Sequence, residues 1–184
     1  MSSEKKYEEY AYVLDFIPRG KSTIIKGREG SIVQAIGEDR LILLELLAME
    51  NKEFEVGEKV KIGREGREKI ISVLGRLKYE ELTAEAKNSL PQVVEIIVKQ
   101  NEKKYVSYFN ALQPITPRLH ALELIPGIGK TFTRQILEVR EKQPFVSFED
   151  IQQRVGLREP AKLIAKRIVE ELSENPRITI FVKK

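Results

Sequence analysis

The sequence predicts an α+β protein with a β-rich first part and a helical last part. Segments rich in β-branched and aromatic residues alternate with glycine turns over the first 78 residues. After residue 117, apolar residues recur at helical spacing and glycines separate short helical segments. A chain of 184 residues, 41% of them hydrophobic, is long enough for two small domains. We therefore expect a β-barrel domain at 1–78, a helical connector at 79–117 and an all-α domain at 118–184.

Short strands separated by glycine turns are expected throughout the first domain. They cover Tyr10–Ile17, Ile24–Ile25, Ser31–Ile36, Arg40–Met49, Val56–Ile62 and Lys69–Leu74. This many short strands in so few residues predicts a small, OB-like barrel and leaves the strand order open. Alternation places Tyr10, Tyr12 and Phe16 on one strand face, which we expect to be the barrel core.

The connector and the last domain are expected to be helical. A helix is expected at Tyr79–Leu90, and Pro91 fits the first position of a following helix. Apolar residues at helical spacing should form a core face: Val93, Val94, Ile96, Ile97, Tyr105 and Phe109. The last domain should contain two helix pairs, Arg118–Leu124 with Thr131–Lys142 and Ile151–Val155 with Pro160–Leu172. Ser147 is an expected N-cap, and residues 177–182 suggest a terminal strand that joins the barrel edge.

Composition excludes several classes of function. The chain has no cysteine, which excludes disulfides, thiolate catalysis and cysteine-based zinc sites. His120 is the single histidine and has no partners for a metal site or a catalytic triad, so we expect it to be structural. No apolar run is long enough to span a membrane, and the N-terminus lacks a hydrophobic signal segment. We expect a cytoplasmic protein that is not an enzyme, with no cofactor and no metal.

The segment Ile125–Lys130 between the first two helices carries the clearest chemical signal. Gly127 and Gly129 lie one residue apart, which allows a tight corner and leaves the main chain open to a ligand. A helix N-terminus follows, where free backbone N–H groups and the helix dipole favour an anion. Lys130 adds a positive charge beside it. We therefore expect this turn to bind a nucleic-acid phosphate.

Two enzymatic interpretations of the same segment fail. A phosphate-binding P-loop needs a glycine five residues before Gly129, at a position occupied by Leu124. The other candidate, ending in Gly20-Lys21-Ser22, has Asp15 at the corresponding position. Base-excision glycosylases combine such a turn with a lysine and a later aspartate, but the rest of a glycosylase domain is absent from this chain.

The helical domain resembles a known nucleic-acid-binding motif. An apolar-x-Gly-apolar-Gly pattern between short helices resembles the helix-hairpin-helix of non-sequence-specific DNA- and RNA-binding proteins. From Leu122 to Leu172 the chain is similar to the tandem helix-hairpin-helix unit of bacterial competence DNA receptors. That resemblance implies that the backbone N–H groups of Gly127, Ile128 and Gly129 meet phosphate. The second hairpin, around Gly156, lacks the second glycine, which makes a structural role the expectation there.

The layout of the whole chain also resembles an archaeal family of uncharacterised proteins. The likeness rests on Tyr7–Phe16, Arg19–Lys21, Gln34–Glu38, Gln113–Thr116 and the first hairpin. It implies a barrel followed by tandem hairpins and nucleic-acid binding, and it supplies no reaction.

Together these patterns predict non-sequence-specific binding of DNA or RNA, single-stranded or duplex. Residues 118–184 hold 13 Lys/Arg against 9 Asp/Glu, whereas the preceding part is balanced. The expected phosphate contacts are Gly127, Ile128, Gly129, Lys130, Thr131, Thr133, Arg134, Arg158 and Lys162. Further basic residues on the same helices are Arg140, Arg154, Lys166 and Arg167, and a candidate barrel surface contains Arg19, Lys21, Lys26 and Arg28. The alternative is a protein-interaction adaptor of ribosomal or repair machinery, with the hairpin domain as a scaffold; the oligomeric state is left open.

Overall fold

The computed structural model of the chain describes residues 7–183 and divides into two compact units. The first unit extends to Val93 and takes in the chain from Leu172 onward, while the second spans Val94–Glu171. The helices α1 (Ala84–Gln100) and α5 (Pro160–Glu174) each contribute to both units. The expected boundaries at residues 78 and 117 therefore fall inside the units.

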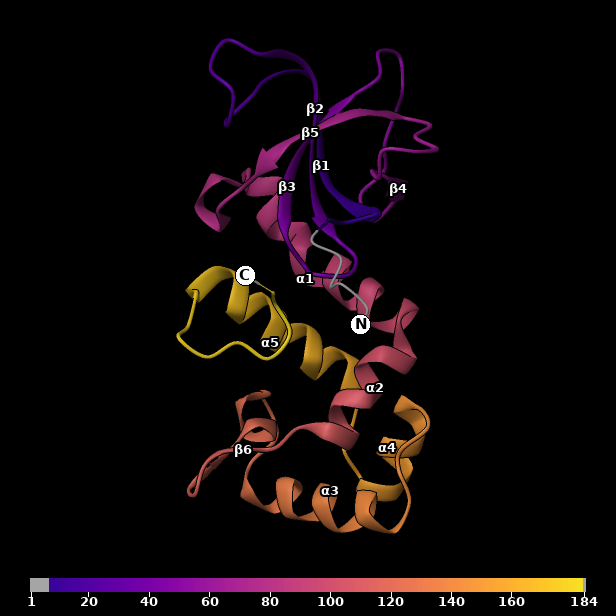
Figure 1. The fold of residues 1–184 in the computed structure, drawn as a ribbon, viewed down its shortest axis with the longest axis vertical. Coiled ribbons are helices and arrows are strands. Elements are labelled where there is room, and N and C mark those ends of the chain that lie inside the picture. Colours follow the sequence, from indigo (N-terminus) through magenta and orange to yellow (C-terminus); the bar gives the residue numbers. More distant parts are fainter. Residues whose placement is uncertain (1–6, 184) are drawn as a thin grey trace. The chain divides into compact units, whose positions relative to one another are not determined.

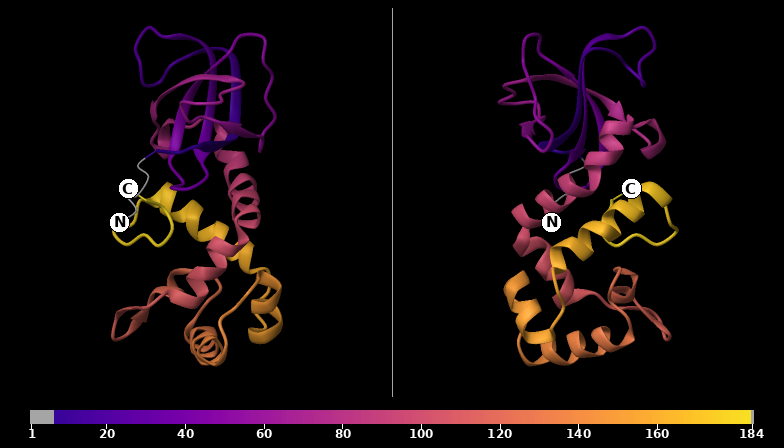
Figure 2. Two further views of the ribbon diagram at one scale, coloured as in Figure 1. Left: turned by 45° about the vertical axis from the view of Figure 1, so that its right-hand side comes forward. Right: turned by 180° about the vertical axis from the view of Figure 1, so that it is seen from behind.

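A curled, five-stranded antiparallel sheet forms most of the first unit (Figure 1). Its strands are β1 (Tyr10–Lys21), β2 (Glu29–Gly37), β3 (Leu43–Ala48), β4 (Lys59–Lys61) and β5 (Ile70–Arg76), in the order β4-β1-β2-β3-β5. The views in Figure 2 show the loop between β1 and β2 extending beyond the strands. Ile24 and Ile25 lie in this loop and not in a strand of their own. The α+β class is confirmed, with a half-barrel sheet as its β part.

The concave side of the sheet holds an apolar cluster that differs from the predicted one. From β1, the cluster takes Ala11 and Val13. Tyr12 is buried outside the cluster and donates its hydroxyl to Glu38 Oε2 at 2.9 Å, while Tyr10 is 38% exposed. A register shift after Val13 then reverses the alternation, which brings Phe16 onto the cluster. The predicted shared face of the β1 aromatic residues is therefore wrong, because a bulge interrupts the period of two.

The helical segment after the sheet starts later and runs further than expected. A 3-10 helix, η1 (Tyr79–Glu81), precedes α1, and α2 (Glu102–Ala111) follows it. Pro91 lies inside α1 and does not begin a new helix. Leu90 and Val93, on either side of the proline, are buried, and this packing offsets the hydrogen bond that Pro91 cannot donate. The predicted core face is confirmed for Val93, Val94, Ile97, Tyr105 and Phe109, which are buried, whereas Ile96 is partly exposed.

The second unit contains short elements that the sequence did not indicate. β6 (Pro114–Thr116) and β7 (Leu119–His120) form a small hairpin, and η2 (Ala121–Leu124) is a 3-10 helix where an α-helix was expected. Then follow α3 (Lys130–Lys142), α4 (Phe148–Val155) and α5. The N-cap prediction is confirmed, because the Ser147 hydroxyl accepts from the Asp150 N–H at 2.9 Å.

The predicted terminal strand is wrong. After α5 the chain turns at Asn175, which has φ +47°, and the described residues that follow form no strand. Phe181 is buried, and the Lys183 N–H donates to the Arg40 carbonyl at 3.2 Å. Arg40 lies in the turn between β2 and β3, so this contact cannot extend into a ladder. No helix in the described part of the chain is long and apolar enough to cross a membrane.

Candidate nucleic-acid interface

The first glycine loop, Ile125–Gly129, joins η2 to α3 and has one position that requires glycine. Gly127 has φ +89°, and a Cβ there would lie 3.2 Å from a methyl group of Leu163 in α5. Gly127 therefore allows α5 to pack directly against the loop. Ile128 is buried, and its N–H donates to the Ile125 carbonyl at 3.0 Å. The implied phosphate contact of the Ile128 N–H is therefore wrong in this conformation, because that donor is already used.

The N-terminus of α3 has donors that the protein itself leaves unused. Gly129 is the N-cap, has no side chain to cap the helix, and faces open space. The first backbone N–H of α3 that forms a hydrogen bond is that of Thr133, which donates to the Gly129 carbonyl at 3.0 Å. Among the described residues, no group accepts from the N–H groups of Lys130, Thr131 or Phe132. With the helix dipole behind them, these donors form a suitable site for an anion.

Lys130 stands at this site, but its charge is partly compensated. Its ammonium lies 2.9 Å from a carboxylate oxygen of Glu123 and also donates to the Arg118 carbonyl. The other Glu123 oxygen accepts from the His120 N–H at 2.8 Å. The bond from His120 and then the contact with Lys130 hold the pKa of Glu123 below its ordinary value, so the carboxylate stays ionised. The Lys130 side chain is nevertheless 68% exposed and can reach an incoming anion.

Of the other α3 residues predicted to contact phosphate, two are exposed and one is buried. Thr131 and Arg134 are exposed near the start of the helix. Thr133 is only 6% exposed, and its hydroxyl has no hydrogen-bond partner among the described residues. The prediction that Thr133 contacts phosphate is therefore wrong, because its side chain points into the packed interior of the unit.

The second glycine loop, Gly156–Glu159, offers fewer donors. Gly156 ends α4 with φ +81°, and its N–H donates to the Gln152 carbonyl at 2.8 Å. The helix that follows begins with Pro160, which has no N–H. Glu159, directly before it, is exposed and adds a negative charge to this loop. Arg158 and Lys162 are exposed beside this loop, so they can add charge but not backbone donors.

The two loops lie close together. Leu163, which packs against Gly127, directly follows Lys162 on the first turns of α5. The exposed ammonium of Lys162 therefore belongs to the same region as the first glycine loop.

Three other arginines of the unit bind groups of the protein itself. Arg154 donates to the carbonyls of Val139 and Gln143 at the end of α3, at 3.2 and 2.7 Å. Arg140 donates to the carbonyls of Phe109 and Leu112 at the end of α2, at 3.1 and 2.9 Å. Arg167 is buried and paired with carboxylates of α5 at 2.9 and 3.5 Å. Arg140 and Arg154 thus lie at helix C-termini, which attract cations, and carboxylates compensate the charge of Arg167.

His120 serves as a cap. Its Nδ1 accepts from the Leu122 N–H at 3.0 Å and so begins η2. Burial lowers the pKa of His120, the positive charge of Arg140 lowers it further, and Glu123 acts in the opposite direction. Within the part of the chain that the structure describes, no cluster of His, Asp and Glu side chains is arranged to hold a metal ion.

The predicted barrel residues gather at the outer end of β1 and in the β1–β2 loop. Arg19 and Lys21 lie on β1, and Lys26 and Arg28 lie in the loop; all four are exposed. The base of the loop is fixed by Glu45, a fully buried residue of β3 that accepts from the Ser22 hydroxyl and from the Thr23 N–H at 2.7 Å. A lone carboxylate within an apolar strand was the sequence signal for this anchor.

Comparison with known proteins gives a family. The family described as "Protein of unknown function (DUF655)" matches residues 7–183. The chain belongs to this family. A crystal structure of a DUF655 protein from Archaeoglobus fulgidus is 44% identical, with a TM-score of 0.85 over 96% of this chain and 100% of that one. An uncharacterised protein of Methanocaldococcus jannaschii is 42% identical over 97% of this chain and 82% of its own length. The resemblance to a family of uncharacterised proteins with archaeal members is thus confirmed.

Proposed function

We propose that the protein binds nucleic acid without sequence preference, through phosphate contacts centred on the N-terminus of α3. The observation that carries this proposal is the set of unused N–H groups at Lys130–Phe132, next to open space at Gly129. Phosphates lack base information, so contacts of this kind position a chain without reading its sequence. On this proposal the two glycine loops form a tandem helix-hairpin-helix, and only the first contacts phosphate through its backbone.

Exposed basic side chains supply the remaining attraction. Arg134, Arg158 and Lys162 are exposed around the two loops, and Lys130 contributes after it loosens its contact with Glu123. We also infer that the curled sheet is an OB-like barrel, because its order β4-β1-β2-β3-β5 would close if β5 paired with β4. Arg19, Lys21, Lys26 and Arg28 would then extend the contact to a second surface.

The decisive variant is Gly129→Asp. An aspartate at an N-cap accepts from the first N–H groups of its helix, so helix stability should rise by a few tenths of a kcal/mol. The same carboxylate would occupy the anion site and repel phosphate. We expect affinity to fall by about tenfold, or 1.4 kcal/mol, measured by fluorescence anisotropy with a random-sequence duplex and with oligothymidylate.

Gln135→Glu is the matched control, because it adds the same charge at an exposed position further along α3. Affinity should change little there. Parent-like affinity in a folded Gly129→Asp variant would show that the first glycine loop does not bind phosphate. Affinities for unrelated duplexes should differ by less than about 1.5 kcal/mol and fall together as salt rises. Binding that is indifferent to salt would favour the protein adaptor instead.

A further inference from the structure

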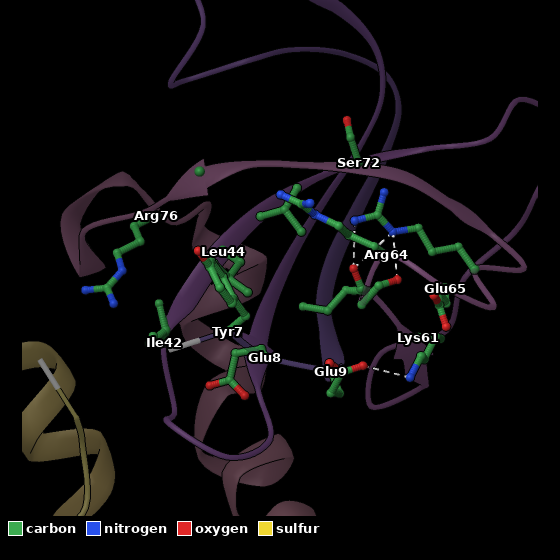
Figure 3. A pocket seen from close by; sticks show the side chains of 15 residues that line it. Tyr7, Glu8, Glu9, Ile42, Leu44, Lys61, Arg64, Glu65, Ser72 and Arg76 are labelled. Atoms are coloured by element: carbon green, nitrogen blue, oxygen red, sulfur yellow. Dashed lines mark hydrogen bonds and ion pairs between the residues drawn. The ribbon is translucent and has the colours of Figure 1, made fainter. Parts of the chain in front are cut away.

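A groove runs along the sheet between its two edge strands, β4 and β5 (Figure 3). Its volume is about 930 Å³, and its lining comes entirely from the first unit. Ile42 and Leu44 of the apolar cluster form part of its floor. The groove thus gives access from solvent to the concave, apolar side of the sheet.

Arg67 bridges one end of this groove. Its Nε donates to the carbonyls of Ile62 and Gly63, both at 3.0 Å, and its Nη1 donates to the Ile71 carbonyl at 2.6 Å. A guanidinium therefore connects the two edges where a backbone ladder would join them in a closed barrel. Among the described residues, no backbone hydrogen bond connects β4 to β5.

The free edge of β5 can pair with another strand. From Ile70 to Gly75 the strand has no charged residue and no proline, two of the features that commonly protect sheet edges, although its register against β3 shifts at two points. Ile71 is 48% exposed and Val73 is 37% exposed. Apart from the bond from Arg67 to Ile71, no described residue bonds to this edge.

Some charged side chains along the groove are paired, and others are not. Glu9 pairs with Lys61 at 2.8 Å, and the Glu8 carboxylate accepts from the N–H groups of Asp39 and Arg40 at 2.8 and 2.6 Å. Arg64 and Arg76 are exposed on the rim, and neither forms an ion pair with a described residue. Glu65 is the exposed carboxylate on the same rim.

We propose that this groove binds an extended segment of a partner protein, which adds to β5 as a further strand. Its backbone would pair with the free edge of β5, its apolar side chains would cover Ile42 and Leu44, and its acidic side chains would meet Arg64 and Arg76. A peptide fits better than a nucleic acid, because the free edge of β5 offers backbone N–H and carbonyl groups that pair with a second peptide backbone. The proposal is independent of phosphate binding by α3.

An array of octapeptides tests the proposal with the full-length protein. All peptides carry valine, isoleucine or phenylalanine at alternate positions, and glutamate, serine or lysine at the positions between. We expect the glutamate series to bind most tightly and the lysine series most weakly. No binding by any series, or preference for lysine, would overturn the proposal.

Charge reversal on the rim identifies the site. The double variant Arg64→Glu, Arg76→Glu should bind the best glutamate peptide about tenfold more weakly, because two attractive charge pairs become repulsive. Lys52→Glu with Lys103→Glu makes the same change in net charge at exposed residues away from the groove and should have little effect. Equal loss in both double variants would mean non-specific attraction and would overturn the assignment.

N-methylation of the peptide tests strand addition itself. Methyl groups on the alternate amides that face β5 should abolish binding, whereas methyl groups on the other set should not. Equal effects of the two sets would exclude a strand pairing. If oligothymidylate, and not the peptides, lost affinity in the Arg64→Glu, Arg76→Glu variant, the groove would be a nucleic-acid site and the proposal would be wrong.

Discussion

The two glycine loops have similar glycine backbones but different surroundings. Gly127 has φ +89° and Gly156 has φ +81°. Gly127 is packed against Leu163 and leads to unused N–H groups, whereas Gly156 faces open space and leads to Pro160. A glycine in the left-handed conformation therefore indicates a sharp turn of the chain and not, by itself, a binding site. Whether a loop can bind an anion depends on what begins the next helix.

Replacement of Gly127 by alanine should have the largest effect on stability. Alanine at φ +89° is strained, and its methyl group would lie 3.2 Å from Leu163. We expect a loss of about 2 to 3 kcal/mol in the free energy of unfolding, measured with urea. The companion variant Gly127→Ala, Leu163→Ala would relieve the clash and separate it from backbone strain. A loss below about 0.5 kcal/mol in the single variant would contradict the packing described for this loop.

Replacement of Gly156 by alanine should cost less. Its φ of +81° strains an alanine, but no atom lies within 4 Å of the added methyl group. We expect a loss of about 1 kcal/mol. Nucleic-acid affinity of the folded variant should match the parent in anisotropy measurements. A clear loss of affinity at parental stability would show that the second loop also binds phosphate.

The stability of the region around the first loop should depend on pH, because the residue that caps η2, His120, is titratable. The cap of α4, Ser147, gives no such dependence. The pKa of buried His120 lies below the ordinary value of 6.5, so the unfolded chain takes up a proton more readily than the folded one. Stability is then fully present above about pH 6.5 and is lost as pH falls towards the folded pKa. We expect His120→Asn, which keeps a capping oxygen, to be less sensitive in urea unfolding between pH 7 and 5. Identical pH profiles for parent and variant would contradict this role of His120.

Arg158 should give the smallest effect. It is exposed beside a loop that offers fewer free backbone donors than the first, so we expect it to contribute through the charge of its side chain. Arg158→Ala should reduce the slope of log affinity against log salt by about one unit at most, with stability unchanged. Lys103→Ala, on α2, is the control for a general loss of charge. A larger change in slope for Arg158→Ala would move the main phosphate contact to the second loop.

Local patterns were enough to predict several of the main elements. Alternating apolar residues indicated β1, β2 and β3, and the spacing of Gly127 and Gly129 indicated a sharp turn before α3. Both signals arise from interactions between residues close in sequence. The burial of Ile97 and Phe109 also followed from helical spacing alone.

Contacts between distant residues were the part that could not be predicted. The bulge after Val13 and the passage of α1 through Pro91 depend on packing against other elements. The same limit applies at the candidate site. No periodic pattern indicates that Thr133 is buried, or that Glu123 approaches Lys130 across a loop. Charged residues were counted as exposed, yet Arg154 binds carbonyl groups at the end of α3.

The buried carboxylate of Glu45 has a consequence for how the β1–β2 loop can move. Its oxygens accept from the Ser22 hydroxyl and the Thr23 N–H, so displacement of the loop base would leave buried oxygens without hydrogen-bond donors. Further bonds continue from this base, because the N–H groups of Ile24 and Ile25 donate to the Ser22 hydroxyl and that of Arg28 donates to the Ile25 carbonyl. Amide hydrogen exchange should therefore be slow at Thr23 and fast at Lys26 and Gly27. The basic residues of the loop are thus carried on a backbone that is fixed from its base, which limits the surface that they can sample.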